Sequence, residues 1–168
     1  MRLYLIRHLP VPAGKGVCYG RLDLAAEGAS AAHIAYLRAQ IPPGTPVFSS
    51  PAQRCLALAN QLYPGPHIDP RLQELDFGSW EGCAWSNIGA DALDAWIAAG
   101  YDGAAHGGES LSALQHRVWQ WADVQQQTAA TAAVTHAGVI RALWSRFQPI
   151  SDCLNLAVPH GEVIVLDW

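Results

Sequence analysis

Three short apolar runs, each followed closely by basic side chains, constrain the fold of this chain most strongly. The first run, residues 3–6, leads directly into Arg7 and His8. Runs of this length, bounded by polar or turn residues, are typical of strands buried in a sheet. The later runs and their basic residues are residues 46–49 with Arg54 and residues 131–135 with His136. Ligands of open α/β sheets bind at the carboxyl ends of the strands, so we expect these basic side chains to converge on one site.

Helix signals lie between the apolar runs and predict an alternation of strands and helices. The expected strands are residues 2–6, 46–49, 67–69 and 131–135, and the expected helices are residues 27–40, 51–63, 92–99, 110–127 and 136–147. Ser50 and Ser110 are expected to cap two of these helices, with Pro51 at a first helical position. Residues 154–158 and 162–167 are expected to form a hairpin. This order predicts an α/β fold, a three-layer α/β/α sandwich around a mostly parallel sheet.

The composition predicts one folded domain over residues 1–168. The chain is 51% hydrophobic and only 14% charged, which is typical of a protein with a buried core. Its net charge of -4 argues against binding nucleic acid, which needs clustered cations. No signal peptide or membrane-spanning stretch is visible, so we expect a cytoplasmic protein that does not bind membranes. The cysteines are too widely spaced for a zinc motif or a disulfide framework: Cys18, Cys55, Cys83 and Cys153.

His8 is the candidate nucleophile. A neutral imidazole nitrogen can attack a phosphoryl group and form a phosphohistidine, which divides one difficult transfer into two easier steps. A single histidine at a strand end is more often held there by a hydrogen bond alone. Arg7 directly before it favours the interpretation in which an anion is held against a nucleophile.

Arg7 and Arg54 are candidates to bind phosphate, because phosphoryl transfer depends on stabilising the charge of the non-bridging oxygens. The alternative for either arginine is a surface ion pair with a carboxylate. His136 can add a second donor to the phosphoryl oxygens, and Ala137 can offer its backbone N–H at the start of the following helix. A helix-capping role for His136 is equally compatible with the sequence.

Two glutamates, Glu74 and Glu81, are candidates for the proton donor. Hydrolysis of a phosphomonoester needs a proton for the leaving oxygen and then a base for the attacking water, and one carboxyl group can do both. The ordinary fate of either residue is a solvated carboxylate in a loop. The remaining histidines lack metal-ligand spacing and no glycine-rich nucleotide loop is present, so we expect neither a metal nor an organic cofactor.

Five segments, taken in order, resemble the motifs of the histidine phosphatase superfamily, also called phosphoglycerate-mutase-like. Together they extend over nearly the whole chain. They are Leu-Ile-Arg-His at residues 5–8, Ser-Ser-Pro-x-x-Arg at 49–54, Glu-Leu-Asp-Phe-Gly-x-Trp-Glu-Gly at 74–82, Gly-Gly-Glu-Ser at 107–110, and Thr-His-Ala-Gly-Val-Ile-Arg at 135–141.

The resemblance implies a three-layer, phosphoglycerate-mutase-like fold and metal-free phosphoryl transfer through a phosphohistidine. It assigns His8 as the nucleophile and Glu74, rather than Glu81, as the proton donor. It also implies a phosphate pocket formed by Arg7, Arg54 and His136.

Residues 17–24 are similar to the substrate loop of the α-ribazole-5'-phosphate phosphatase branch. This similarity places Tyr19 and Arg21 in a substrate loop and the Gly20 backbone beside the phosphate. The chain departs from the common pattern directly after His8, where Leu-Pro-Val at residues 9–11 replaces Gly-Glu-Thr. No asparagine precedes Asn60, so the sequence leaves open whether a phosphate contact is lost there.

The expected function is hydrolysis of a small-molecule phosphate ester, with α-ribazole 5'-phosphate of cobalamin synthesis as the favoured substrate. The alternatives are a broad-specificity small-molecule phosphatase, a protein phosphohistidine phosphatase, and a degenerate member that binds a phosphorylated ligand without turnover. The length of the chain argues against a glycolytic mutase, which resembles this pattern but normally carries insertions.

Overall fold

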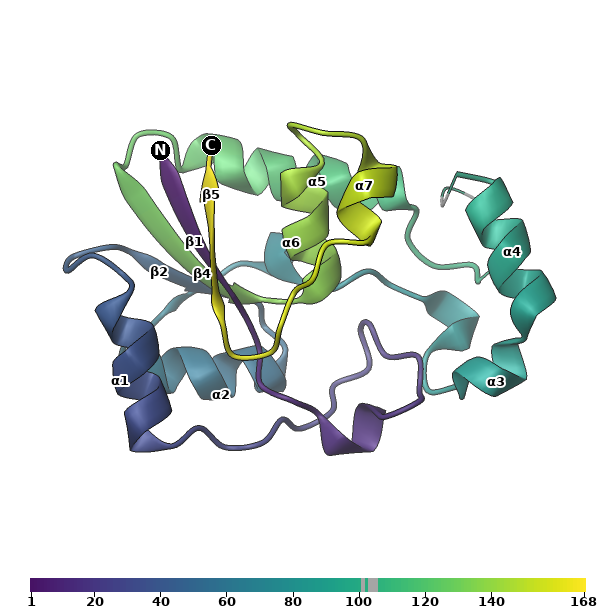
Figure 1. Ribbon diagram of the computed structural model, residues 1–168, viewed down its shortest axis with the longest axis horizontal. Helices are drawn as coiled ribbons and strands as arrows, with labels where there is room; N and C mark the ends of the chain where they lie inside the picture. Colours follow the sequence, from purple (N-terminus) through teal and green to yellow (C-terminus); the bar gives the residue numbers. More distant parts are fainter. Residues whose placement is uncertain (101, 103–105) are drawn as a thin grey trace.

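A five-stranded sheet forms the centre of the computed structural model, which describes residues 1–100, 102 and 106–168 (Figure 1). The order across the sheet is β3-β2-β4-β1-β5. All neighbouring strands are parallel except β5, which runs antiparallel to β1 at one edge. The prediction of a mostly parallel sheet is therefore confirmed. The strands are β1 (Arg2–Arg7), β2 (Val47–Ser49), β3 (His67–Ile68), β4 (Ala130–Thr135) and β5 (Val163–Asp167).

Helices cover both faces of the sheet, because successive side chains of a strand point to opposite faces. Leu3 and Leu5 of β1 belong to one hydrophobic core, with α5 and α6. Tyr4 and Ile6 belong to the other, with α1 and α2. Figure 1 shows these helix pairs on opposite sides of the sheet, which confirms the three-layer prediction. The helices are α1 (Ala31–Ala39), α2 (Gln53–Leu62), α5 (Leu111–Val124) and α6 (Ala137–Trp144).

The observed caps change two of the expected helix starts. Helix α1 begins at Ala31 rather than at residue 27, because the Ser30 hydroxyl caps it by accepting the N–H of His33 at 3.1 Å. The expected Ser50 cap is wrong: α2 begins only at Gln53, and the Ser50 hydroxyl contacts the site described below. The Ser110 cap of α5 is confirmed by its 3.1 Å hydrogen bond from the N–H of Ala113.

The predicted C-terminal hairpin is wrong. Residues 150–154 form the short helix α7 (Ile150–Leu154), and β5 pairs with β1 instead of with a neighbouring strand. The N–H of Gly161 donates to the carbonyl of Arg7 at 3.0 Å, so the chain turns directly onto the open edge of β1. An unpaired strand edge inside the molecule attracts the last strand more effectively than a local hairpin does.

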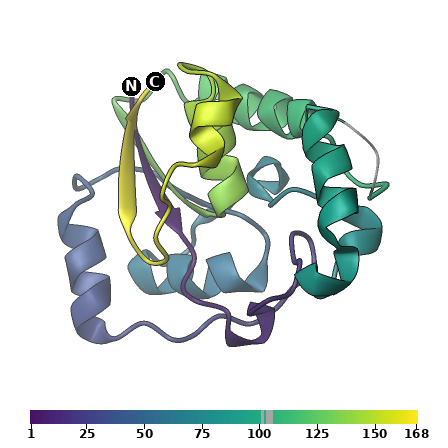
Figure 2. The same ribbon diagram turned by 45° about the vertical axis from the view of Figure 1, so that its right-hand side comes forward.

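An arm leaves the sheet after β3 and returns at α5. It contains the 3₁₀ turns η2 (Pro70–Leu72) and η3 (Gly78–Trp80) and the helices α3 (Trp85–Ile88) and α4 (Ala90–Ala98). Figures 1 and 2 show α3 and α4 on the side away from α1, next to the loop that follows β1. This loop, which includes η1 (Pro12–Gly14), is joined to the arm by a hydrogen bond from Cys18 to Cys83.

Across the residues that the structure describes, no helix is both long enough and apolar enough to span a bilayer.

Candidate active site

A cavity of about 200 Å³ lies at the carboxyl ends of β1 and β4. The structure brings to it the basic residues of all three apolar runs, although they lie far apart in the chain. This convergence follows from the parallel order of β1, β4 and β2, which places the three strand exits at one edge. The polar residues of the lining are Arg7, His8, Tyr19, Arg54, Glu74 and His136.

The His8 ring is oriented by a contact between one of its nitrogens and a backbone carbonyl. Its Nδ1 lies 2.7 Å from the carbonyl oxygen of Leu9. A carbonyl oxygen can only accept, so Nδ1 carries the proton and Nε2 carries the lone pair of the neutral ring. Burial, together with repulsion from Arg54, lowers the pKa of His8 from 6.5 to about 3. The imidazole is therefore neutral at physiological pH, and Nε2 keeps the lone pair that nucleophilic attack requires.

His136 lies beside His8, with 5.3 Å between the ring centroids. Its Nε2 is 2.8 Å from the hydroxyl oxygen of Ser50, which fixes the orientation of the ring. Burial, with repulsion from Arg54 and His8, lowers the pKa of His136 well below its usual value. His136 precedes α6, but its side chain makes no capping hydrogen bond. The geometry therefore supports a contact with the ligand better than a helix-capping role.

Arg7 and Arg54 each place a guanidinium group in the cavity wall. Nη1 of Arg7 donates to the carbonyl of Val158 at 2.7 Å. The terminal nitrogens of Arg54 donate to the carbonyls of Gly20 and Leu22. Within the described part of the chain, the buried Nε atoms of both arginines have no hydrogen-bond partner. Buried donors are normally paired, so both guanidinium groups, which belong to residues of the cavity lining, keep unused hydrogen-bonding capacity.

Glu81 is a structural anchor for the predicted substrate loop. Its carboxylate accepts the backbone N–H groups of Gly20, Arg21, Leu22 and Phe77 at 2.9 to 3.0 Å. Four charge-assisted hydrogen bonds of this kind hold a carboxylate in one place and occupy its lone pairs. The carboxylate of Glu81 is therefore used to bind backbone N–H groups.

Glu74 is the carboxylate that lines the cavity. Its Oε1 accepts the N–H of Leu75 at 2.9 Å, and its Oε2 accepts the N–H of Gly138 at 3.0 Å. The second of these donors lies in the first turn of α6, where the helix dipole favours a negative charge. The geometry favours Glu74 over Glu81 as the group that exchanges protons with a ligand.

The sequence matches the histidine phosphatase superfamily (branch 1) over residues 3–168. This chain belongs to that superfamily. As a histidine phosphatase superfamily member it is an enzyme with phosphatase or mutase activity. No protein with a curated description matches the chain.

Solved structures of the same fold come from Thermus thermophilus and Escherichia coli. The T. thermophilus protein TTHB049 is 29% identical, with a TM-score of 0.79 over 100% of this chain and 94% of that one. A phosphoglycerate mutase from the same organism is 30% identical, with the same TM-score and coverage. A candidate α-ribazole-5'-P phosphatase from E. coli has a TM-score of 0.81 over 98% of this chain and 89% of that one. Its 23% identity shows a shared fold alone.

In the predicted substrate loop, residues 17–24, the backbone of Gly20 pairs with a protein side chain. The N–H of Gly20 donates to Glu81 instead of facing the cavity. A Cβ at Gly20 would lie 1.8 Å from the carbonyl oxygen of Leu75, so glycine is required there by close packing. Tyr19 does line the cavity, and its ring centroid is 5.3 Å from the guanidinium carbon of Arg54. Ala137 also lines the cavity.

Of the three residues directly after His8, two join the core, Pro10 is exposed, and none lines the cavity. Leu9 and Val11 are buried hydrophobic residues, and Leu9 packs with α1 and α2. The cavity wall on this side comes from later in the loop, from Gly14, Val17 and Tyr19. Where the common family pattern has Gly-Glu-Thr, this chain has Leu-Pro-Val, and two of these residues pack in the hydrophobic core.

Two contributions to the site were missed by sequence reasoning. Trp85 of α3 lines the cavity. His160 contacts the backbone of His8: Nδ1 of His160 lies 2.9 Å from the carbonyl oxygen of His8. The two residues are separated by most of the chain, so no local pattern connects them.

Within the described residues, no group of three or more His, Cys, Asp or Glu side chains could hold a metal ion.

Proposed function

We propose that this enzyme hydrolyses phosphomonoesters through a phosphohistidine formed on His8. The observation that carries the proposal is the meeting of the unprotonated Nε2 of His8 and the carboxyl group of Glu74 in one cavity. Arg7 and Arg54, whose buried Nε atoms have no partner among the described residues, line the same cavity. A nucleophile, a proton donor and an anion site are the parts that such a reaction needs.

The reaction has two steps. Nε2 of His8 attacks phosphorus, the bond from phosphorus to the ester oxygen breaks, and the leaving alcohol takes a proton from Glu74. Water then attacks the phosphohistidine and gives a proton to Glu74, which releases inorganic phosphate and restores His8. Arg7, Arg54 and His136 stabilise the charge on the non-bridging oxygens in both steps.

The favoured substrate is α-ribazole 5'-phosphate, an ester with a flat aromatic base. An apolar chamber of about 430 Å³ adjoins the cavity and shares Glu74, Trp85 and Ala137 with it. A chamber of this kind favours a ring-bearing alcohol over a small polar one. Its other apolar residues include Phe77, Leu93, Trp96, Leu111, Leu114 and Ile150.

The mechanism is tested by replacing the nucleophile. In a His8→Asn variant we expect no turnover of p-nitrophenyl phosphate and no acid-labile phosphoenzyme on rapid quenching. The matched control is His116→Asn, because His116 is exposed on α5 and its loss should leave both readouts unchanged. Hydrolysis retained by the folded His8 variant would contradict the mechanism and would leave the binding-protein alternative unsupported as well.

The substrate is tested by comparing esters that differ in their organic part. We expect kcat/KM for α-ribazole 5'-phosphate to exceed that for ribose 5-phosphate by about 10- to 100-fold, since burying an aromatic ring is worth roughly 1.5–3 kcal/mol. Equal values would favour a broad-specificity phosphatase. Interconversion of phosphoglycerates without net hydrolysis would favour a mutase, and preference for a phosphohistidine peptide would favour a protein phosphatase.

A further inference from the structure

We propose that Glu109 positions the proton donor Glu74 by holding two arginines against its backbone. Glu109 is not among the residues that line the cavity, and its carboxylate pairs with arginines, so it is a positioning residue. The inference rests on the proposed function, in which Glu74 exchanges the protons. The two arginines are Arg21 of the substrate loop and Arg117 of α5.

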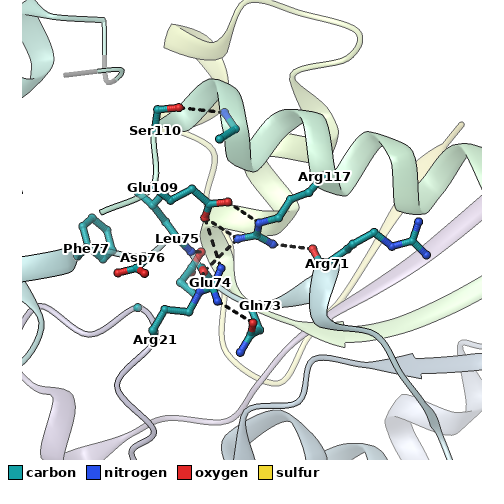
Figure 3. Close-up of polar contacts among 12 residues, drawn as sticks. Arg21, Arg71, Gln73, Glu74, Leu75, Asp76, Phe77, Glu109, Ser110 and Arg117 are labelled. Atoms are coloured by element: carbon teal, nitrogen blue, oxygen red, sulfur yellow. Dashed lines mark hydrogen bonds and ion pairs between the residues drawn. The ribbon is translucent and has the colours of Figure 1, made fainter. Parts of the chain in front are cut away.

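Arg117 bridges Glu109 and the Glu74 backbone (Figure 3). Its Nε and Nη2 donate to the two carboxylate oxygens of Glu109 at 2.6 and 2.8 Å, which is a bidentate ion pair. Nη2 also donates to the carbonyl oxygen of Glu74 at 3.1 Å, and Nη1 donates to the carbonyl of Arg71 at 2.6 Å. Both side chains of the pair are largely buried, so their geometry is well defined.

Arg21 donates to the same carbonyl oxygen of Glu74. Its Nε donates to the carbonyl oxygen of Glu74 at 2.9 Å, and its Nη1 donates to Gln73 at 2.7 Å. Its Nη2 lies 3.7 Å from a carboxylate oxygen of Glu109. A carbonyl oxygen has two lone pairs, so the two arginines occupy both acceptor positions of the backbone carbonyl oxygen of Glu74.

Glu109 is what makes this arrangement stable. Two guanidinium groups that donate to one oxygen bring two positive charges close together, and Glu109 is the anion that faces both. Removing one partner of a largely buried ion pair leaves an uncompensated charge and is strongly unfavourable. Without the carboxylate, we expect one arginine to leave and the Glu74 backbone to shift.

The junction before α5 fixes Glu109 in this place. The N–H of Glu109 donates to the carbonyl of Asp76 at 2.8 Å, and Ser110 caps α5 directly afterwards. A Cβ at Gly108 would lie 2.1 Å from the carbonyl oxygen of Asp76, so the approach of the two segments requires glycine. This packing gives a physical role to the Gly-Gly-Glu-Ser segment at residues 107–110.

A shift of the Glu74 backbone would move the carboxyl group of the same residue. Among the described residues, two backbone N–H groups, those of Leu75 and Gly138, donate to the Glu74 carboxylate. A misplacement of about 1 Å of a catalytic group can cost about 100-fold in rate. Because the proton matters most when the leaving alcohol is a poor one, the loss should depend on the leaving group.

The test compares Glu109→Gln with Glu162→Gln on two substrates. Glu162 accepts from the hydroxyl of Tyr36 near the surface, which makes it a matched control. We expect Glu109→Gln to lower kcat for a simple alkyl phosphate about 10-fold, with less than about a twofold loss for p-nitrophenyl phosphate, in line with misplacement of a proton donor. KM should be unchanged for both, and Glu162→Gln should resemble the parent enzyme.

A Glu74→Gln reference separates this inference from the proposed function. If Glu74→Gln shows the leaving-group dependence and folded Glu109→Gln does not, the positioning role is wrong and the function stands. Equal losses on both substrates would also overturn it. If Glu109→Gln fails to fold, the Arg117→Lys variant tests the inference instead, because lysine keeps the charge but lacks the planar group that pairs with both carboxylate oxygens of Glu109. That variant must show the same selective loss.

Discussion

Gly138 lies directly against the carboxyl group of Glu74. Its N–H donates to Oε2 of Glu74 at 3.0 Å, and a Cβ at Gly138 would lie 2.2 Å from Oε1. The first turn of α6 therefore receives the carboxyl group of Glu74, the proposed proton donor, in a space that only glycine leaves open. The Thr-His-Ala-Gly segment serves two parts of the site, since His136 faces the cavity and Gly138 seats the carboxylate.

The first prediction concerns Gly138→Ala. The added methyl group must displace the Glu74 carboxylate, so we expect kcat for an alkyl phosphate to fall about 10- to 100-fold, the range expected for a misplaced catalytic group. Turnover of p-nitrophenyl phosphate should fall much less. Gly28→Ala is the control, because a Cβ there meets nothing within 4 Å. Unchanged kinetics in folded Gly138→Ala would contradict the placement of Glu74.

The second prediction separates the two glutamates. Glu81→Gln replaces a carboxylate that accepts four N–H groups with a side chain that has one acceptor oxygen. Each lost charge-assisted hydrogen bond is worth about 1.5–3 kcal/mol, so the unfolding midpoint in urea should fall. Activity should fall by similar factors for alkyl and p-nitrophenyl phosphates. A leaving-group dependence like that of Glu74→Gln would identify Glu81 as the proton donor instead.

The third prediction concerns pH. The pKa of His8 is about 3 in the folded protein, against 6.5 for an unperturbed histidine such as that of the unfolded chain. Between these two pH values the unfolded chain binds a proton at His8 that the folded chain does not bind. Stability from this group is complete above about pH 6.5 and is lost as the pH falls towards 3, by at most about 1.4 kcal/mol per pH unit.

Urea unfolding of the parent and of His8→Asn between pH 4 and 8 measures this effect. The stability of the parent relative to the variant should fall as the solution becomes more acidic and should be constant above about pH 7. His136 is shifted in the same direction and is present in both proteins, so its contribution largely cancels. A difference that does not change with pH would contradict the buried neutral state of His8.

The fourth prediction concerns Trp85, which lines both the cavity and the apolar chamber. Trp85→Ala should raise KM for an aromatic ester more than KM for ribose 5-phosphate, because the aromatic contact is lost. Inhibition by inorganic phosphate should change little, since the arginines remain. The exposed Val124→Ala on α5 is a control for loss of apolar surface. Equal changes for both esters would place the aromatic base elsewhere.

The sequence predicted the sheet and the convergence of basic residues because those depend on short-range patterns. The apolar runs at β1, β2 and β4 have the length and flanking residues of buried strands, and the parallel order then brings Arg7, Arg54 and His136 to one edge. The prediction of a C-terminal hairpin was wrong because the pairing of β5 depends on a strand far away in the sequence. Residues 154–158 have a strand-like composition, but the open edge of β1 attracted β5 instead.

What the sequence determined by itself is the set of groups: a histidine behind a buried strand, basic residues at two more strand exits, and two loop glutamates. Only the tertiary structure decided how these groups are used. Glu74 faces the cavity and Glu81 binds the loop backbone, although both lie in one short segment. Arg117 of α5 reaches the Glu74 backbone, and Glu109, just before that helix, pairs with Arg117. Hydrogen bonds depend on distances of about 3 Å, and such distances between remote residues are set only when the whole chain has packed.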